Sequence, residues 1–422
     1  MRRGDENILR IDWLALSLYL LLVMVGWLNI YASVYDENEA RSIFDVTTNS
    51  GRQFIFILLT VIPVFLVWVI DFRFFYSFSF IIYGLSLLLL IVTLFIARDI
   101  NGAHSWIEIG SFRFQPSEFV KISTCLMLAR VFAATGFNVS KLSDIGKAIL
   151  VLVIPFALIV LQRDMGTALV FLSLLIVLYR EGMSPLPLLV GLLAVIILAL
   201  TLMVERLYLL LGIIFVFLLI ILLLKKKFKN IAIAVISMGL LVGFIYSIDF
   251  ILNDVLSKYQ KERIEQVFNP NADPLGSGWN VTQSKIAIGS GGINGKGYLN
   301  GTQTKFDFVP EQSTDFIFCT IGEEHGFIGS FIFIILFITL LLRLILIAER
   351  QKWQFARVYG YGVACILFIH FVINVGMTIG LFPVIGIPLP FFSYGGSSLF
   401  SFTILLFLLL KFDLHRSQVL DR

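Results

Sequence analysis

Long apolar runs separated by short polar stretches fill most of the chain, and the run lengths predict its main elements. A run of about 20 apolar residues is long enough to cross roughly 30 Å of hydrocarbon as a helix. The runs are continuous rather than alternating, which excludes a transmembrane β-barrel. We therefore predict an all-α bundle of about 12 spans, at residues 13–33, 53–70, 78–97, 116–135, 148–161, 167–179, 188–203, 207–224, 231–248, 327–347, 358–378 and 399–410.

The basic residues predict how these spans are oriented. Lys and Arg gather at the span ends that the positive-inside rule assigns to the cytoplasm, most densely over residues 225–229. Both termini are then cytoplasmic, and the polar segment 249–326 is extracytoplasmic. The net charge of +4 reflects this topology and does not indicate nucleic-acid binding. We expect a multi-pass protein of the cytoplasmic (inner) membrane, in contact with membrane lipids.

Two stretches between the spans do not read as regular spans. Residues 98–118 alternate aromatic and polar side chains and predict an interfacial segment. The stretch 380–398 holds three prolines and four glycines, which prevent a regular helix, yet it is too apolar for an open loop. It therefore predicts a re-entrant element buried in protein. We treat residues 1–422 as a single membrane domain.

The predicted fourth span opens with a pair of opposite charges. Glu118 and Lys121 are three residues apart and so share one face of the helix that Pro116 begins. Charges inside a membrane are costly, and they tend to face a cavity and to pair with each other. Two interpretations stay open: an ion pair at a helix end, and a charged pair with a part in function.

The polar segment 249–326 is the strongest candidate for chemistry. Within it, Asp273-Pro-Leu-Gly276 predicts a turn, which is all that these four residues show by themselves. The glycines at 289–297 would let backbone N–H groups approach an anion, and Lys285 and Lys296 would neutralise phosphate. Interleaved aromatic residues would rest on the membrane surface. The segment would suit an amphiphile with a phosphate head group and a lipid tail; the alternative is a solvated loop.

Candidate metal ligands are few. Glu323, His325 and Asp315 are a weak set, because no second histidine lies at a metal-binding spacing. The acidic residues at 323 and 324 are equally explained by the positive end of a helix dipole. His370 lies in the middle of a predicted span and reads as a core histidine with its hydrogen bonds satisfied. The three cysteines contain no CxxC pair and read as small buried hydrophobic residues.

Several motifs, in the right order over nearly the whole chain, resemble the SEDS family of shape, elongation, division and sporulation proteins. Two of them, at 301–303 and 308–316, are closer to the rod-shape members than to the division members. Family members usually have ten spans, so a surplus pair is expected within 188–224. The matching motifs are Asn101–Ile107, Phe114–Lys121, Asp273–Asn280, Gly301–Gln303, Phe308–Phe316 and Pro388–Ser398.

The resemblance implies a peptidoglycan glycosyltransferase that polymerises lipid II at the outer face of the cytoplasmic membrane, together with a class B penicillin-binding protein. The family's catalytic aspartate falls on Asp273, which would act as general base, and its Glu–Lys pair falls on Glu118 and Lys121. A divalent cation, Mg²⁺ or Mn²⁺, could add positive charge at the leaving diphosphate. The further side chains expected to bind substrate are Arg113, Lys285, Lys296, Gln303, Glu311, Thr314 and Ser393.

Other functions weighed on the sequence are a lipid II flippase and a scaffold for cell-wall enzymes. Alternating access usually shows broken helices in matching halves, and the broken element at 383–390 has no counterpart in the first half. A scaffold has no need of a charge pair inside a span. A division or sporulation paralogue would share the same chemistry.

Overall fold

The structure, a computed structural model, describes residues 11–35, 41–100, 103–110, 112–223, 228–250, 254, 261, 278–306 and 308–416. The chain separates into two compact units. The first comprises residues 1–183, 283–379 and 385–422, and the second comprises 184–282 and 380–384. The single domain expected over residues 1–422 stays a prediction.

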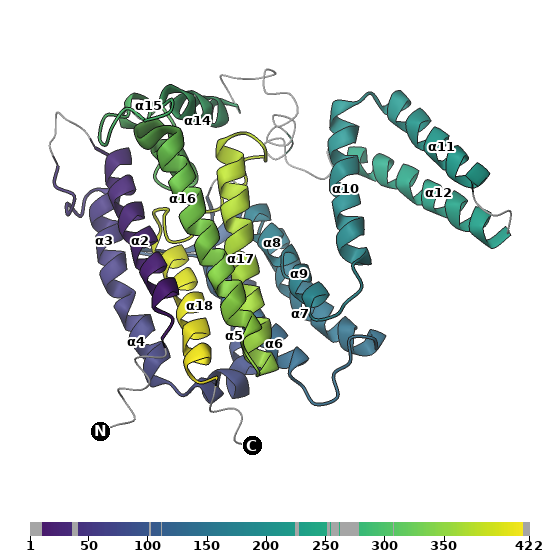
Figure 1. Cartoon of the computed structure of the whole chain (residues 1–422), viewed down its shortest axis with the longest axis horizontal. Coiled ribbons are helices and arrows are strands. Elements are labelled where there is room, and N and C mark those ends of the chain that lie inside the picture. Colours follow the sequence, from purple (N-terminus) through teal and green to yellow (C-terminus); the bar gives the residue numbers. More distant parts are fainter. Residues whose placement is uncertain are drawn as a thin grey trace. The chain divides into compact units, whose positions relative to one another are not determined.

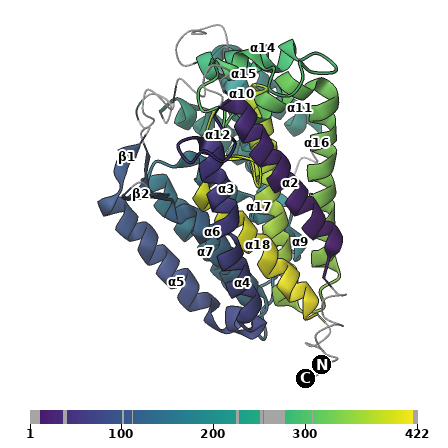
Figure 2. The ribbon, with the colours of Figure 1, turned by 90° about the vertical axis from the view of Figure 1, so that its left-hand side faces the viewer.

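The first unit is a helical bundle with a small sheet, and Figures 1 and 2 show α14 and α15 across one end of it. The second unit contains three long helices. In chain order the helices are α2 (Trp13–Ser33), α3 (Asn49–Leu59), α4 (Val61–Val69), α5 (Phe72–Ile96), α6 (Pro116–Phe132), α7 (Leu142–Leu161), α8 (Met165–Leu172), α9 (Leu175–Arg180), α10 (Leu186–Met203), α11 (Arg206–Leu223), α12 (Phe228–Phe250), α14 (Trp279–Ser290), α15 (Thr302–Lys305), α16 (Ile317–Glu349), α17 (Gln354–Thr378) and α18 (Gly396–Leu414).

Among the described residues, ten helices are long and apolar enough to cross a membrane, with α3 and α4 counted together as one. The chain is therefore a multi-pass helical membrane protein, as predicted. Two of the twelve predicted spans fall outside this set. They are helical but shorter: α6 has 17 residues, and α8 and α9 share the stretch Met165–Arg180. For these two segments a full crossing stays a prediction.

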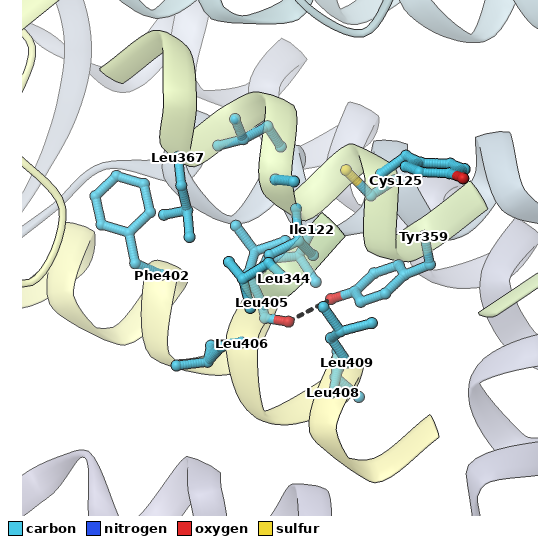
Figure 3. Packing of buried hydrophobic residues seen from close by; sticks show 14 of the residues in the cluster. Ile122, Cys125, Leu344, Tyr359, Leu367, Phe402, Leu405, Leu406, Leu408 and Leu409 are labelled. Carbon is cyan, nitrogen blue, oxygen red and sulfur yellow. Dashed lines mark hydrogen bonds between the residues drawn. The ribbon is translucent and has the colours of Figure 1, made fainter. Parts of the chain in front are cut away.

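The core of the first unit lies around α17 and α18. The most apolar stretch of α17 is 72% buried and that of α18 is 83% buried, whereas that of α5 is 22% buried. Helices α17 and α18 are therefore central, and α5 is peripheral. Figure 3 shows Tyr359 and Leu367 of α17 packed with Leu405 of α18 and Leu344 of α16. The Tyr359 hydroxyl donates to the Leu405 carbonyl at 3.2 Å. Van der Waals packing of this kind holds helices together in lipid, where hydrophobic exclusion from water is absent.

The Pro/Gly-rich segment enters the bundle, which confirms the predicted re-entrant element. Residues 385–395, between α17 and α18, form no helix or strand and are mostly buried. The backbone of Phe392 lies directly against Gly26 of α2. Gly26 is seven residues before the end of α2 at Ser33, so the segment reaches about 10 Å below that end at 1.5 Å per residue.

We expect Gly26→Ala to destabilise the protein by about 1–3 kcal/mol, because the new methyl group overpacks a backbone contact. A Cβ at this position would lie 2.7 Å from the Phe392 Cα and 2.9 Å from its carbonyl oxygen. Thermal unfolding in detergent measures the loss. Gly84→Ala on α5 is the matched control, because no atom lies within 4 Å of its Cβ position and alanine favours a helix. Equal stabilities of the two variants would contradict the close approach.

Ion pairs hold the start of α2 and the end of α18 together. Arg350 donates to Asp12, the N-cap of α2, at 2.8 Å and to Asp413 near the end of α18 at 2.7 Å. Burial raises the pKa of Asp12, but hydrogen bonds from Arg343 and the Ala15 amide outweigh it, so this pKa lies below its ordinary value. The first and last helices thus meet at one end of the bundle, as expected for termini on the same side of a membrane.

Residues 98–114 form strands that were not predicted, while their position at the membrane interface stays a prediction. Three short antiparallel strands, β1 (Arg98–Ile100), β2 (Ala103–Ile109) and β3 (Phe112–Phe114), form a sheet in the order β1-β2-β3 within an otherwise helical fold. The alternation that we attributed to interfacial anchoring is also the period of a strand. Helix α5 also begins earlier than predicted, at residue 72 rather than 78. In α16 a helical stretch from residue 317 precedes a kink at Gly326, and the span predicted from residue 327 follows that kink.

In sequence, the second unit includes the stretch 188–224, where the surplus pair of spans was expected. Helices α10, α11 and α12 bury only a small apolar cluster among themselves, at Ile197, Leu209, Ile245 and Ile248. The rest of their surface is apolar and mostly exposed. Such a surface is what lipid-facing helices present. The basic residues 225–227 that support its orientation lie outside the described residues.

Candidate active site

Glu118 and Lys121 form a fully buried ion pair near the start of α6. Their side chains are 1% and 0% exposed, and the Lys121 Nζ lies 2.8 Å from each carboxylate oxygen of Glu118. The ammonium also lies 4.5 Å from the centre of the Phe402 ring, a cation–π distance. The predicted pairing is therefore present.

His370 of α17 completes the shell around the Lys121 ammonium. Its Nε2 lies 3.0 Å from the Lys121 Nζ, and its Nδ1 lies 3.1 Å from the Pro388 carbonyl oxygen. Because a carbonyl can only accept, Nδ1 carries the hydrogen and the neutral Nε2 accepts from Lys121. Two carboxylate oxygens and one imidazole nitrogen then use all the ammonium hydrogens. In this arrangement Lys121 has no donor left for a phosphate.

The re-entrant segment is bound to the predicted motif 308–316. The Ser393 hydroxyl donates to the Thr314 carbonyl at 2.6 Å, and the Tyr394 amide donates to the Ser313 carbonyl at 2.9 Å. The Thr314 hydroxyl in turn donates to the Glu311 carboxylate at 2.9 Å. Three of the predicted substrate-binding residues, at 311, 314 and 393, are therefore brought together. Glu311 is the exposed member of the three.

Asn374, one helical turn after His370 on α17, joins the same two segments. Its amide nitrogen donates to the Asp315 carbonyl at 2.9 Å and to the Ile387 carbonyl at 2.8 Å. Its side-chain oxygen is buried and has no partner among the described residues. Sequence reasoning missed this residue. A polar side chain one turn from a mid-span histidine was the available signal.

Lys296 is bound to Glu323 at 2.7 Å rather than facing outward as a free cation. The buried Glu323 carboxylate also accepts from the amides of residues 302, 303 and 304 at the start of α15, at 2.8–3.0 Å, and from the hydroxyls of Thr302 and Thr304. It therefore stabilises the N-terminus of α15 rather than that of α16, which begins six residues earlier. Gln303, one of the predicted substrate-binding residues, takes part in this arrangement through its backbone N–H.

A metal at Glu323 is not supported, because six hydrogen bonds already occupy its two oxygens. Within the described part of the chain, no three His, Cys, Asp or Glu side chains lie close enough together to hold a metal ion. The divalent cation implied by the resemblance stays a prediction.

We expect Glu323→Gln to loosen the start of α15, because an amide nitrogen cannot accept the bonds that a carboxylate oxygen accepts. Amide hydrogen exchange at residues 302–304 should accelerate by roughly tenfold to a hundredfold, because buried N–H donors that lose their acceptor destabilise the folded start of α15. Glu324→Gln is the comparison: that neighbour is equally buried but accepts from the backbone of Leu299 and Gly301, ahead of residues 302–304. Equal acceleration in both variants would show that Glu323 has no special part in holding α15.

The glycines at 291–297 have a different role from the predicted one. Helix α16 is kinked at Gly326, where φ is 63° and ψ is −158°, values open to glycine. The glycine loop supplies the missing backbone partners: the amides of residues 296 and 297 donate to the carbonyls of 323 and 324, and the amide of Phe327 donates to the carbonyl of Gly292. A Cβ on Gly291 would lie 2.0 Å from the Gly322 carbonyl oxygen. Gly291 and Gly295 therefore allow close packing against α16.

Two predicted cations remain exposed. The Arg113 side chain is 62% exposed and lies 3.3 Å from Glu108 across the sheet. Lys285 is exposed on α14 and has no partner among the described residues. Asp273, the predicted general base, lies outside the described residues.

The fold and these contacts define a multi-pass membrane protein with a buried charge network beneath a re-entrant segment. A family model described as "Cell cycle protein", whose label names FtsW, RodA and SpoVE, matches residues 12–211 and 188–418. The chain belongs to this family, which confirms the resemblance. The two matched ranges overlap at 188–211, in the region where the surplus spans were predicted.

Curated relatives and solved structures agree with this assignment. The chain is 34% identical to peptidoglycan glycosyltransferase RodA of Treponema pallidum over 415 residues, covering 92% of this chain and 94% of that one. It is 35% identical to peptidoglycan glycosyltransferase MrdB of Escherichia coli K12, covering 75% and 73%.

Two solved structures share the fold. A chain from a peptidoglycan synthase complex, studied for how polymerization and crosslinking are coordinated, matches with a TM-score of 0.69 and 26% identity, covering 97% of this chain and 99% of that one. RodA of Thermus thermophilus matches with a TM-score of 0.60 and 24% identity, covering 96% and 97%, which shows the fold alone.

Proposed function

We propose that this chain is a RodA-like peptidoglycan glycosyltransferase, which polymerises lipid II into glycan strands at the outer face of the cytoplasmic membrane during cell elongation. The observation that carries the proposal is the match over 92% of the chain to a relative named for that activity. The motifs at 273–280, 301–303 and 308–316 belong to the predicted extracytoplasmic segment, where we propose that the chemistry occurs.

The reaction joins a sugar hydroxyl of one lipid II to the anomeric carbon of another. A new C–O bond forms, the C–O bond to the lipid diphosphate breaks, and the hydroxyl proton passes to Asp273 as general base. The leaving diphosphate needs positive charge as its bond breaks. The exposed Lys285 could supply it, as could Arg113, which is 62% exposed although it pairs with Glu108, whereas Lys121 and Lys296 are more buried in their ion pairs.

When bound, a divalent cation such as Mg²⁺ or Mn²⁺ would supply further positive charge at the diphosphate. A class B penicillin-binding protein is the proposed partner, which agrees with the synthase complex among the structural matches. Both termini are proposed to be cytoplasmic, supported by the Arg350 contacts that join the start of α2 and the end of α18 at one end of the bundle.

Polymerisation by purified protein tests the proposal. The complex with a class B penicillin-binding protein, in detergent with lipid II and Mg²⁺, should yield glycan strands that a muramidase degrades. A crosslinking-deficient partner separates polymerisation from crosslinking. Absence of polymer, together with movement of fluorescent lipid II across proteoliposomes, would instead favour the flippase.

A further inference from the structure

We propose that His370 is a positioning residue for the reaction: it fixes the orientation of the Lys121 ammonium and couples the buried ion pair to the re-entrant segment. The proposal rests on the proposed function, because the reaction is where positioning is measured. It assigns His370 no contact with substrate. Its effect passes through Lys121 on one side and through Pro388 on the other.

The first argument is the shell around Lys121. Lys121 is 0% exposed, and its partners are the two Glu118 oxygens at 2.8 Å and the His370 Nε2 at 3.0 Å. Glu118 alone leaves one ammonium hydrogen unpaired in a site without water access, where an unmet donor is costly. The imidazole supplies that acceptor without adding a second negative charge. It therefore holds the ammonium in a single orientation.

The second argument is the other side of the imidazole ring. His370 Nδ1 holds the Pro388 carbonyl at 3.1 Å, and Asn374 one turn later holds the preceding carbonyl, that of Ile387, at 2.8 Å. Two side chains on one face of α17 thus hold consecutive peptide carbonyls of the re-entrant segment. Because the ring is rigid, a shift of Pro388 changes where Nε2 points.

The third argument is where the re-entrant segment leads. Asn374 also holds the Asp315 carbonyl at 2.9 Å, and Ser393 holds the Thr314 carbonyl at 2.6 Å. Both carbonyls belong to the motif 308–316, which carries the exposed Glu311. A continuous set of hydrogen bonds therefore runs from Glu118 through Lys121 and His370 to the re-entrant segment and on to that motif. His370 is the link in this set that touches both the charges and the segment.

Three substitutions separate the two bonds of His370. His370→Gln can present an acceptor near Nε2 for Lys121 but loses the bond to Pro388. His370→Asn can present a donor near Nδ1 for Pro388 but does not reach Lys121. His370→Leu keeps neither bond. Thr378→Val on the same helix is the matched control, because the buried Thr378 hydroxyl donates only one turn back, to the Val375 carbonyl at 2.7 Å.

We expect kcat for lipid II polymerisation to fall in the order wild type, then Gln and Asn, then Leu. The Leu variant should lose up to roughly 100-fold, the scale of a small misplacement of catalytic groups. KM should change much less, because the substrate contacts are untouched. The control should keep wild-type kinetics. A Leu variant with wild-type kcat, a loss confined to KM, or an equal loss in Thr378→Val would overturn the proposal.

A second measurement does not depend on activity. NMR of protein with ring-¹⁵N histidine, with the His370 signal assigned by its loss in His370→Gln, should show a neutral ring protonated at Nδ1. A ring protonated at Nε2 or at both nitrogens would overturn the proposal even if every variant folds poorly. Lack of polymer from the wild type would count against the proposed function, while the NMR result would still decide how His370 is bonded.

Discussion

Asp273→Asn is expected to reduce lipid II polymerisation by about 10²–10⁴-fold, the usual loss when a general base is removed. Asparagine has nearly the shape of aspartate, so the turn at Asp273-Pro-Leu-Gly276 should still form. The amide cannot take the proton of the attacking hydroxyl, so kcat should fall with little change in the amount of folded protein. Quantifying glycan strands from matched amounts of purified complex measures the effect.

Asp254→Asn is the matched control, since this exposed carboxylate belongs to the same predicted extracytoplasmic segment and matches none of the family motifs. It should polymerise lipid II at the wild-type rate. Circular dichroism and thermal unfolding of both variants check that they fold alike. Wild-type polymerisation by Asp273→Asn would show that another group accepts the proton, and the assignment of the catalytic residue would fail.

Breaking the buried ion pair should cost more stability when one partner is removed than when both are. Glu118→Gln leaves the Lys121 ammonium buried without its counter-charge, and Lys121→Met leaves a buried carboxylate. Each loss is expected to be about 3–5 kcal/mol, whereas the double variant should recover much of it because no charge stays unpaired. Thermal unfolding of the three variants in one detergent measures the pattern.

Activity of the double variant then decides between the two interpretations of this pair. If the pair only serves the helix end, a folded double variant should polymerise lipid II normally; we expect it to stay inactive. Lys147→Met on α7 is the control, because its ion pair with Asp144 at 2.9 Å is solvent-exposed at the lysine and should matter little to either measurement. If the stability loss of the double variant equals the sum of the two single losses, the charges are not coupled.

Much of the helical architecture could be predicted from the lengths of the apolar runs. The first span was placed at 13–33, the same bounds as α2, because its ends are marked by Asp12 and by the polar residues after Ser33. The starts of α5 and α16 could not be predicted as well. Arg73 near the start of α5 and the charged stretch Glu323–His325 before the kink of α16 read as loop in the sequence.

The candidate site could be predicted only where its residues are neighbours in sequence. Glu118 and Lys121 share a helix face, so their pairing followed from spacing alone. Lys121 and His370 are 249 residues apart, and no local pattern indicates that they meet. The glycines at 291–297 suggested an anion site because the sequence does not reveal the kink at Gly326 that uses their backbone groups. Long-range partners of this kind need the fold.

The meeting of the first and last helices at Arg350 has a practical consequence for protein engineering. Because Asp12 and Asp413 share this one guanidinium, a short linker could join the start of α2 to the end of α18 in a circularly permuted chain. The exposed loop around Gly136, between α6 and α7, offers new ends on the side predicted to hold the native termini. Reporter proteins could then be attached there, away from the membrane face at which the chemistry is proposed.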